Sequence, residues 1–456
     1  MSKGFLSLFF IVSFVVLFSG GFRFISTQER AYAADLSNNA HSSGVYKPGI
    51  FKHERLLDVF HKSDRLESKG LSLELVYTAD FLTNHTGGLK KTGSGVDTSI
   101  SYLANTDLTA ELDTEVAGLW KGGKFLIYLL NNHGATPSEF RIGDLQTVSN
   151  IETKDSTRLY ELWYEQTFDL FGTDLSMLIG QHDLNSEFDV TEYGSLFTHS
   201  SFGIGPDISV NVPVSIFAVA APAIRLKWEP NDSLYFMAAV YDGDPGDPDV
   251  NRSGMRWRHS STEGFMYIYE MGYHFGDPEE SQTFPGSYKL GYWQHTAEFD
   301  DVRDTDENEN PLEHHKNYGI YFLFDQMLIP GEGKRGLGAF FQIGGAPGDR
   351  NEVDFYVGGG IHYQGIIPSR EDDVLGLAVA HASISGNLRD AEDVAEADGS
   401  TFHSRDTHET AIELTYKSQI TPWLTIQPGV QTVFNPGADA GLDDAVISIL
   451  RFQINF

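Results

Sequence analysis

The sequence predicts an all-β protein, a transmembrane antiparallel β-barrel of about sixteen strands, and three observations point to it. Segments in which apolar and polar side chains alternate with a period of two recur along the 456 residues. Their apolar faces are rich in Tyr and Phe, which suits a lipid band flanked by aromatic girdles. Beyond the amino terminus, no stretch approaches the ~18 continuous apolar residues of a transmembrane helix, so a closed barrel is the membrane-spanning form open to the chain.

The amino-terminal residues predict export. Lys3 is followed by an apolar run from Phe5 to Phe18, and AYA at residues 31–33 fits a small-x-small cleavage site. A run of about 14 apolar residues is too short to span a bilayer of ~30 Å, so residues 1–33 are expected to be a cleaved signal peptide. Cleavage removes three basic residues and one acidic residue, which changes the formal net charge to −32 − 2 = −34.

Residues 34–70 are expected to form a periplasmic or lumen segment ahead of the barrel, which takes up residues 71–456. Leu56, Leu57 and Phe60 could share one face of a short amphipathic helix in this segment. A periplasmic lead-in explains such a helix at least as well as a plug of the pore.

The strands are predicted from their alternation. In GFMYIYEMGYHF, Glu270 and His274 lie opposite a face of six large apolar residues, which are Phe265, Tyr267, Tyr269, Met271, Tyr273 and Phe275. The closing strand, VISILRFQINF, places Phe452 and Phe456 on the lipid face and Arg451 on the pore face. Sixteen such segments begin near residues 71, 99, 124, 157, 173, 223, 233, 263, 287, 315, 336, 351, 373, 407, 422 and 444.

The connections between these strands alternate between tight turns and long loops. The second, fourth, sixth and fourteenth strands end in the turn-like sequences WKGGK, LFGTD, EPNDS and ITPW. The third, fifth, seventh, ninth and thirteenth strands open into long loops at residues 133–156, 182–222, 242–262, 297–314 and 385–406. This alternation is typical of outer-membrane barrels, which have short periplasmic turns and long external loops.

One or two of the loops are predicted to fold into the lumen. Residues 182–222 include the apolar sequence VPVSIFAVAAPA, which argues against a freely solvated loop and favours one that narrows the pore. Residues 133–156 also exceed the length that a surface connection needs. The acidic runs within 297–314 and 385–406 are instead expected to be solvated external loops.

Long motifs resemble those of the carbohydrate-selective porin family (the OprB type). They are SLELVYTADFLTN, RIGDLQTVSNIETKDSTRLYELWYEQTF, LIGQHDLNSEF, AVYDGDP and TPWLTIQPGVQTVFNPG. The chain departs from the family at its amino end, where KPGIFKHERLL stands in place of a frequent Trp-Gly-Gly stretch. The resemblance implies a sixteen-stranded barrel in the outer membrane of a Gram-negative bacterium, through which small sugars, monosaccharides such as glucose, diffuse passively.

The same resemblance implies several partners. The terminal Phe456 is similar to the carboxyl-terminal signal that the barrel assembly machinery reads. Outer-membrane lipid and lipopolysaccharide are expected to surround the barrel, and no cofactor is expected.

Candidate residues for sugar contact combine charged and aromatic side chains, because a sugar offers hydroxyl groups and an apolar face. In RLYELWYEQTF, alternation predicts that Tyr160, Leu162 and Tyr164 face lipid and that the residues between them face the pore. The predicted pore-lining set is Glu161, Trp163, Glu165, Arg141, Asp144, Glu187 and Arg225. For any one of them alone, a polar residue that only keeps the lumen hydrated is a better explanation than direct sugar contact.

Other classes of function lack support in the sequence. It contains no GxSxG, HExxH or P-loop motif and no cysteine nucleophile, so an enzyme is not expected. No metal site is predicted, since DGDPGDPD is more simply an exposed acidic turn. The strongly negative charge argues against nucleic-acid binding. Two alternatives to a sugar channel stay open: a general porin that prefers cations, and a surface adhesin that acts through its loops.

Overall fold

The computed structural model describes residues 66–91, 95–276, 284–397 and 405–456. The predicted signal peptide and the predicted amphipathic helix around Leu56 and Phe60 lie outside the described residues. None of the helices in the described part of the chain is long and apolar enough to cross a membrane.

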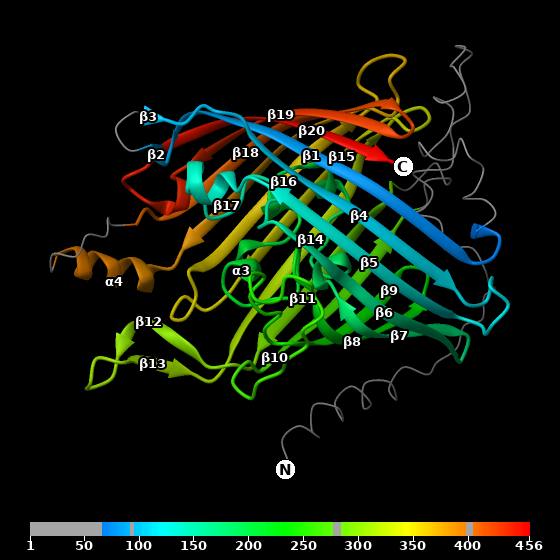
Figure 1. Cartoon of the computed structure of the whole chain (residues 1–456), viewed down its shortest axis with the longest axis horizontal. Coiled ribbons are helices and arrows are strands. Elements are labelled where there is room, and N and C mark those ends of the chain that lie inside the picture. Colours follow the sequence, from blue (N-terminus) through cyan, green and yellow to red (C-terminus); the bar gives the residue numbers. More distant parts are fainter. Residues whose placement is uncertain (1–65, 92–94, 277–283, 398–404) are drawn as a thin grey trace. The chain divides into compact units, whose positions relative to one another are not determined.

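Sixteen antiparallel strands close into one barrel (Figure 1). They are β1 (Leu71–Gly88), β4 (Ser101–Asp113), β5 (Gly123–Gly134), β6 (Ser156–Leu170), β7 (Thr173–His182), β8 (Ala221–Asn231), β9 (Leu234–Asp242), β10 (Phe265–Phe275), β11 (Gly286–His295), β14 (Asn317–Pro330), β15 (Gly336–Gly345), β16 (Val353–Gln364), β17 (Val374–Ile384), β18 (His408–Thr421), β19 (Leu424–Phe434) and β20 (Asp443–Asn455). Pairing of β1 with β20 closes the barrel, with Asp80 opposite Arg451. The sixteen predicted strand starts differ from these by no more than two residues.

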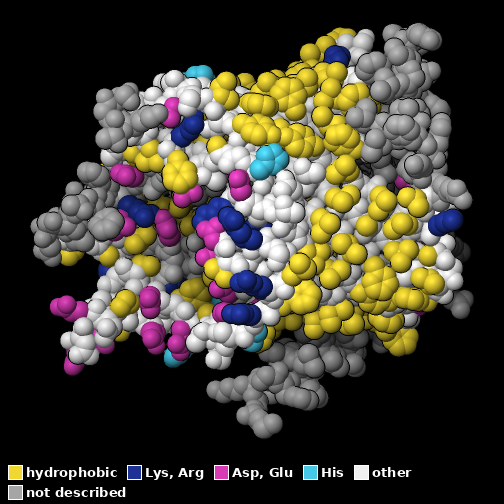
Figure 2. Space-filling model, viewed as in Figure 1, with side chains coloured by type: hydrophobic (Ala, Val, Ile, Leu, Met, Phe, Trp, Pro, Cys, Tyr) yellow, Lys and Arg dark blue, Asp and Glu magenta, His cyan; other side chains and the backbone are white. Residues whose placement is uncertain are grey.

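The predicted division into lipid and pore faces is confirmed on most strands. On β10, Phe265 and Met271 are 39% and 42% exposed on the outer wall, whereas Glu270 points inward and is 3% exposed. Hydrophobic side chains cover a broad area over the strands, and acidic side chains gather at the end that carries the hairpin of β12 (Phe299–Thr305) and β13 (Pro311–His314) (Figure 2). An apolar outer wall and a polar inner wall are what a barrel needs to cross a lipid bilayer.

The prediction is wrong for the beginning of β6. Tyr160 is 2% exposed and packs inside the barrel with Leu130, although the sequence predicts it on the lipid face. The pairing of β5 with β6 explains this, because the register shifts between Tyr128 and Leu129 and inserts a β-bulge. A bulge adds one residue to one strand and so interrupts its alternation. As a result, the consecutive residues Tyr160 and Glu161 are both buried within the barrel.

Two long connections fold into the lumen, at the upper end of the one or two that the sequence predicts. The first, residues 135–155, contains the π-helix η3 (Ser138–Ile142). The second, residues 183–220, contains the 3₁₀ helices η4 (Leu184–Ser186), η5 (Tyr193–Leu196) and η6 (Ser200–Phe202) and the helical turn α3 (Pro206–Ser209). We call the second connection the lumen loop.

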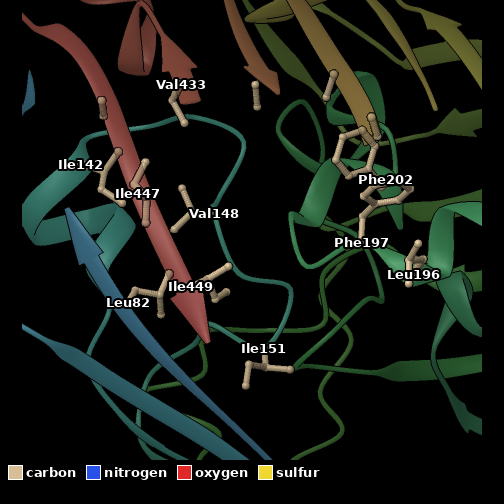
Figure 3. Packing of buried hydrophobic residues seen from close by; sticks show 14 of the residues in the cluster. Leu82, Ile142, Val148, Ile151, Leu196, Phe197, Phe202, Val433, Ile447 and Ile449 are labelled. Carbon is tan, nitrogen blue, oxygen red and sulfur yellow. The ribbon is translucent and has the colours of Figure 1, made fainter. Parts of the chain in front are cut away.

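Apolar side chains hold both connections against the inner wall. Ile447 and Ile449 on β20 pack with Ile142 and Val148 of the first connection (Figure 3). Phe197 of the lumen loop belongs to the same buried cluster. Several inward-facing positions of the barrel are therefore apolar, because they contact folded chain rather than water.

The acidic external segments contain regular structure that the sequence analysis missed. Residues predicted to be a solvated loop form the hairpin of β12 and β13, and the helix α4 (Gly386–Ala397) lies in another acidic run. An ion pair joins them, since Arg303 Nη1 is 3.6 Å from Asp390 Oδ2.

Candidate functional site

The candidate site lies where the lumen loop meets strands β6, β7 and β8. At its centre is Arg225, whose side chain is 2% exposed. Its guanidinium donates from Nε and Nη2 to the two Glu187 carboxylate oxygens, both at 2.6 Å. It also donates to Glu165 Oε1 at 3.0 Å and to Ser176 Oγ at 2.6 Å. We call Arg225, Glu165 and Glu187 the Arg225 cluster.

Backbone geometry at the start of the lumen loop places Glu187 beside Arg225. Asp183 caps η4, since its Oδ1 accepts the N–H of Asn185 at 2.9 Å. Glu187 directly follows this short helix, and its N–H donates to the carbonyl of Leu184. Burial alone would raise the pKa of Glu187, but the Arg225 charge and His182 outweigh it and lower that pKa. Glu187 is therefore an anion opposite a cation.

Glu161 anchors the lumen loop rather than contacting Arg225. Its Oε1 accepts the N–H of Asp183 at 2.8 Å, and it is 6% exposed. Tyr160, brought inward by the β-bulge, donates from its hydroxyl to Asp183 Oδ2 at 2.7 Å. Burial raises the pKa of Asp183 to about 6. The bulge thus gives β6 two adjacent residues that hold the same end of the loop.

Aromatic rings lie next to the Arg225 cluster. The Trp163 ring meets His182 edge to face, with centroids 6.4 Å apart. His182 hydrogen-bonds through Nδ1 to the Tyr241 hydroxyl at 2.9 Å and through Nε2 to Ser186 Oγ at 3.1 Å. His182 Nε2 is also 3.7 Å from Glu187. Charged and aromatic groups therefore occur together, which is the combination that a sugar channel needs.

Part of this inner wall remains open to water. The Glu165 and Glu187 side chains are 18% and 26% exposed. Farther along β8, Lys227 is 29% exposed and pairs with Glu229 at 2.9 Å. The apolar part of the lumen loop lines a cavity of about 280 Å³ together with Asp244. Partly exposed charges of both signs can exchange hydrogen bonds with a passing solute.

The structure places Arg141 and Asp144 away from the Arg225 cluster. Both belong to residues 135–155, which pack near β1, β18 and β20. Arg141 donates from Nη1 to the carbonyl of Ser99. Asp144 lies near Glu152 and Glu409, and burial raises its pKa to about 6. Five of the seven predicted residues thus gather around β6 to β8 and two lie elsewhere.

Sequence reasoning missed a set of carboxylates that hold the inward connections. Glu413 on β18 accepts the N–H groups of Thr198 and His199 and the Thr198 hydroxyl. The other members of this set are Glu270 on β10, Asp325 on β14 and Glu409 on β18, each of which accepts backbone N–H groups of a connection. The sequence shows acidic residues at pore-facing positions, but it does not show which amide each one meets.

The comparisons with known proteins agree with this architecture. The model of the carbohydrate-selective porin, OprB family, matches residues 97–456. The chain is 25% identical to Porin B of Pseudomonas aeruginosa over 93% of this chain and 95% of that protein. It is 21% identical to the putative porin QuiX of Acinetobacter baylyi over 86% of this chain and 90% of that protein.

Solved structures show the same fold. The high-pH structure of Pseudomonas putida OprB superimposes with a TM-score of 0.80 at 22% identity and covers 89% of this chain and 99% of that chain. The low-pH structure of the same protein has a TM-score of 0.54. The chain belongs to the carbohydrate-selective porin, OprB family, whose members are channels of the Gram-negative outer membrane rather than enzymes.

Proposed function

We propose that monosaccharides such as glucose diffuse passively through this channel and pass the Arg225 cluster at its narrowest part. The observation that carries the proposal is the arrangement of Arg225 between Glu187 and Glu165, on a wall that still reaches water. Family membership supports sugars as the class of solute, and the curated relatives are named as porins.

The chemistry of the cluster suits a neutral polyol. A sugar hydroxyl both donates and accepts hydrogen bonds, so it can pair with carboxylates and with ammonium groups in turn. Glu165, Glu187 and Lys227 are each partly exposed and supply both kinds of partner. Charges that already pair with one another bind a neutral solute weakly, which favours release and hence conduction.

The aromatic residues complete this proposal. Trp163 is partly exposed beside the charged groups and meets His182 edge to face, and the buried Tyr241 supports His182 from behind. A sugar ring has an apolar face that packs on aromatic side chains while its hydroxyl groups reach polar ones. We therefore keep Glu161, Trp163, Glu165, Glu187 and Arg225 as the proposed sugar-contact region and treat Glu161 as the residue that fixes its shape.

The alternative is a general porin that prefers cations. The formal net charge of −32 and the carboxylates on the inner wall favour it. Such a channel would carry ion current that sugar does not reduce. An adhesin would instead bind its partner through external loops such as the β12–β13 hairpin, independently of the open pore.

Liposome swelling with the refolded protein tests the proposal. Glucose, a disaccharide and an uncharged amino acid of similar size are compared, with protein-free liposomes as the blank. A saturable rate for glucose that exceeds the rate expected from its size supports a selective sugar channel. Rates that follow solute size alone would leave a general porin.

We also infer how the chain reaches the membrane. Residues 1–33 have the features of a secretory signal peptide, and Phe456 resembles the terminal residue that the assembly machinery reads. The N–H of Phe456 donates to the carbonyl of Leu75 on β1 at 2.9 Å, so the last residue adjoins the barrel closure. Lipopolysaccharide is the expected neighbour of the outer wall on the side of the long loops.

A further inference from the structure

A second cluster of functional groups lies away from the pore-lining residues, at the end of the barrel that carries the long loops. Asp301 belongs to β12, His314 to β13 and Asp349 to the connection between β15 and β16. One ligand atom from each residue lies within 4.8 Å of the other two. Three segments that are separate in the sequence thus bring one imidazole nitrogen and two carboxylate oxygens together.

We propose that these three residues bind a zinc ion that fastens the β12–β13 hairpin to the β15–β16 connection. Zinc in proteins is usually four-coordinate, with nitrogen, oxygen or sulfur ligands, and three protein ligands plus one water form a known type of site. Calcium takes six to eight oxygen ligands, so an imidazole nitrogen among so few donors disfavours it.

The distances between the donor atoms suit a zinc ion. His314 Nε2 is 2.8 Å from Asp301 Oδ2 and 3.9 Å from Asp349 Oδ2. A tetrahedral ion bound at ~2.0–2.2 Å separates its ligand atoms by about 3.3–3.6 Å, which falls between these two distances. These two donor pairs therefore need to change by only several tenths of an ångström, and the third pair, Asp301 and Asp349, lies within 4.8 Å.

Neighbouring groups already hold two of the ligands in place. Asp301 is 8% exposed, and its Oδ1 accepts the N–H groups of Arg303 and Asp304 at 2.9 and 2.8 Å, which leaves Oδ2 toward His314. Arg350 donates from Nε to Asp349 Oδ1 at 2.7 Å and from Nη2 to Asp349 Oδ2 at 2.9 Å. Zinc binding at Oδ2 therefore replaces or shares the second of these two hydrogen bonds. Such outer contacts orient carboxylates for a metal and are typical of built sites. When zinc binds through the lone pair of His314 Nε2, the ring proton moves to Nδ1.

The surroundings favour a cation and leave room for solvent. Residues 299–314 contain seven acidic residues and one basic residue, a net charge of −6. A concentration of one sign of charge raises the local concentration of counter-ions. A cavity of about 480 Å³, lined by Asp349, Asp354, Ser385 and Asn387 among others, adjoins the cluster and can admit the water that completes the coordination.

Zinc binding to the full chain in detergent tests the proposal. Equilibrium dialysis against micromolar ZnCl₂, followed by elemental analysis, gives the number of ions bound per chain. His314→Ala and Asp301→Asn are each expected to lose one equivalent. The matched control is His315→Ala, because His315 is the next residue, is 83% exposed and pairs with Glu298 at the surface.

A second group of residues could also bind a metal ion, so the zinc measurement needs a control for it. Asp242, His259 and Glu263 also lie within 4.8 Å of one another, and the His259 side chain is 44% exposed. His259→Ala tells whether any further ion belongs to that set. If His314→Ala fails to fold, Asp349→Asn gives the same readout.

Three results would overturn the proposal: no bound zinc, an unchanged stoichiometry in the folded His314 variant, or displacement of zinc by an equal concentration of calcium. A gain in protease resistance of the β12–β13 hairpin with zinc, lost on addition of chelator, would support it. Liposome swelling with glucose is measured separately, so failure of the zinc site leaves the sugar channel untouched.

Discussion

Arg225 on strand β8 and Glu187 in the lumen loop are joined by two hydrogen bonds of 2.6 Å, one to each carboxylate oxygen. A bidentate pair fixes both distance and orientation. The loop can therefore not move inward or outward at this point without breaking a buried ion pair. Together with the contacts of Glu161 and Tyr160 to Asp183, this pair holds the lumen loop against the wall beside β8.

Replacing Glu187 by Gln should loosen the lumen loop where it meets Arg225, while Glu161 and Tyr160 still hold Asp183. Removing one partner of a buried ion pair costs about 3 kcal/mol or more, and Glu165 compensates only in part. We expect a lower thermal unfolding temperature and a larger, noisier single-channel conductance in planar bilayers.

The matched control for this change is Glu229→Gln. Glu229 is 45% exposed and its pair with Lys227 lies on the same strand, so little change in conductance is expected. Equal conductance in wild type and Glu187→Gln would show that the ion pair does not set the pore width.

The two acidic residues of β6 should behave differently when each is changed to Gln. Glu165 is 18% exposed beside Arg225 and can meet a passing solute, whereas Glu161 is buried against the Asp183 N–H. A hydrogen bond from a sugar hydroxyl to a charged group is worth ~1.5 kcal/mol. Because ~1.4 kcal/mol is a factor of ten in affinity, Glu165→Gln should raise the half-saturation concentration for glucose about tenfold.

Glu161→Gln should instead lower stability and change uptake of all solutes together. Swelling rates for glucose and for an uncharged amino acid of similar size separate the two effects. A Glu165 variant that slows both solutes equally would contradict a role in sugar selectivity.

Most of the barrel could be predicted because its strands obey a local rule. Alternation with a period of two depends on neighbours in sequence, and the tight turns between strands mark the ends. The β-bulge in β6 breaks that rule, but nothing in the sequence RLYELWYEQTF indicates a bulge. The inward position of Tyr160 could therefore not be predicted from the sequence. The acidic runs that form β12, β13 and α4 contain many charged and few large apolar residues, which is why the sequence analysis assigned them to solvated loops.

The candidate site could be predicted only in part. Glu161, Glu165 and Arg225 are on strands, and alternation places them toward the pore. Their partners depend on contacts between distant residues, as when Glu413 meets Thr198 across 215 positions of sequence. Long-range pairing of a carboxylate with a loop amide leaves no periodic pattern in the sequence.

Glu413→Ala should destabilise the lumen loop at its centre. Glu413 is fully buried, and its removal leaves the N–H groups of Thr198 and His199 without their acceptor. Each buried donor left unpaired costs about 1–3 kcal/mol, so a loss of about 3 kcal/mol in unfolding free energy is expected. Urea unfolding of the refolded protein measures it.

The control for Glu413→Ala is Glu413→Gln. The Gln side chain keeps an acceptor oxygen, so this variant should recover part of the lost unfolding free energy. Hydrogen exchange at residues 196–202 should increase more in the Ala variant than in the Gln variant. Unchanged exchange in both would contradict the role of Glu413 as an anchor.

Docking of residues 135–155 should weaken as pH rises. Burial raises the pKa of Asp144 to about 6, and burial together with the Asp144 charge raises that of Glu152 to about 8. A carboxyl group with a raised pKa binds its proton more tightly in the docked state than in the released state. Its contribution is therefore complete below its ordinary pKa and is lost as pH rises through the raised value.

We expect hydrogen exchange at residues 138–152, corrected for the intrinsic pH effect, to show strong protection at pH 5 and weaker protection at pH 9. Glu152→Gln should remove the part of this change that occurs near pH 8, because a neutral amide cannot ionise. Lys154→Gln is the control, since Lys154 lies two residues away and pairs with Asp249 at the surface, where its side chain is 52% exposed. If wild type keeps the same protection from pH 5 to pH 9, the two carboxyl groups are neutralised by another partner and do not control the docking of this connection.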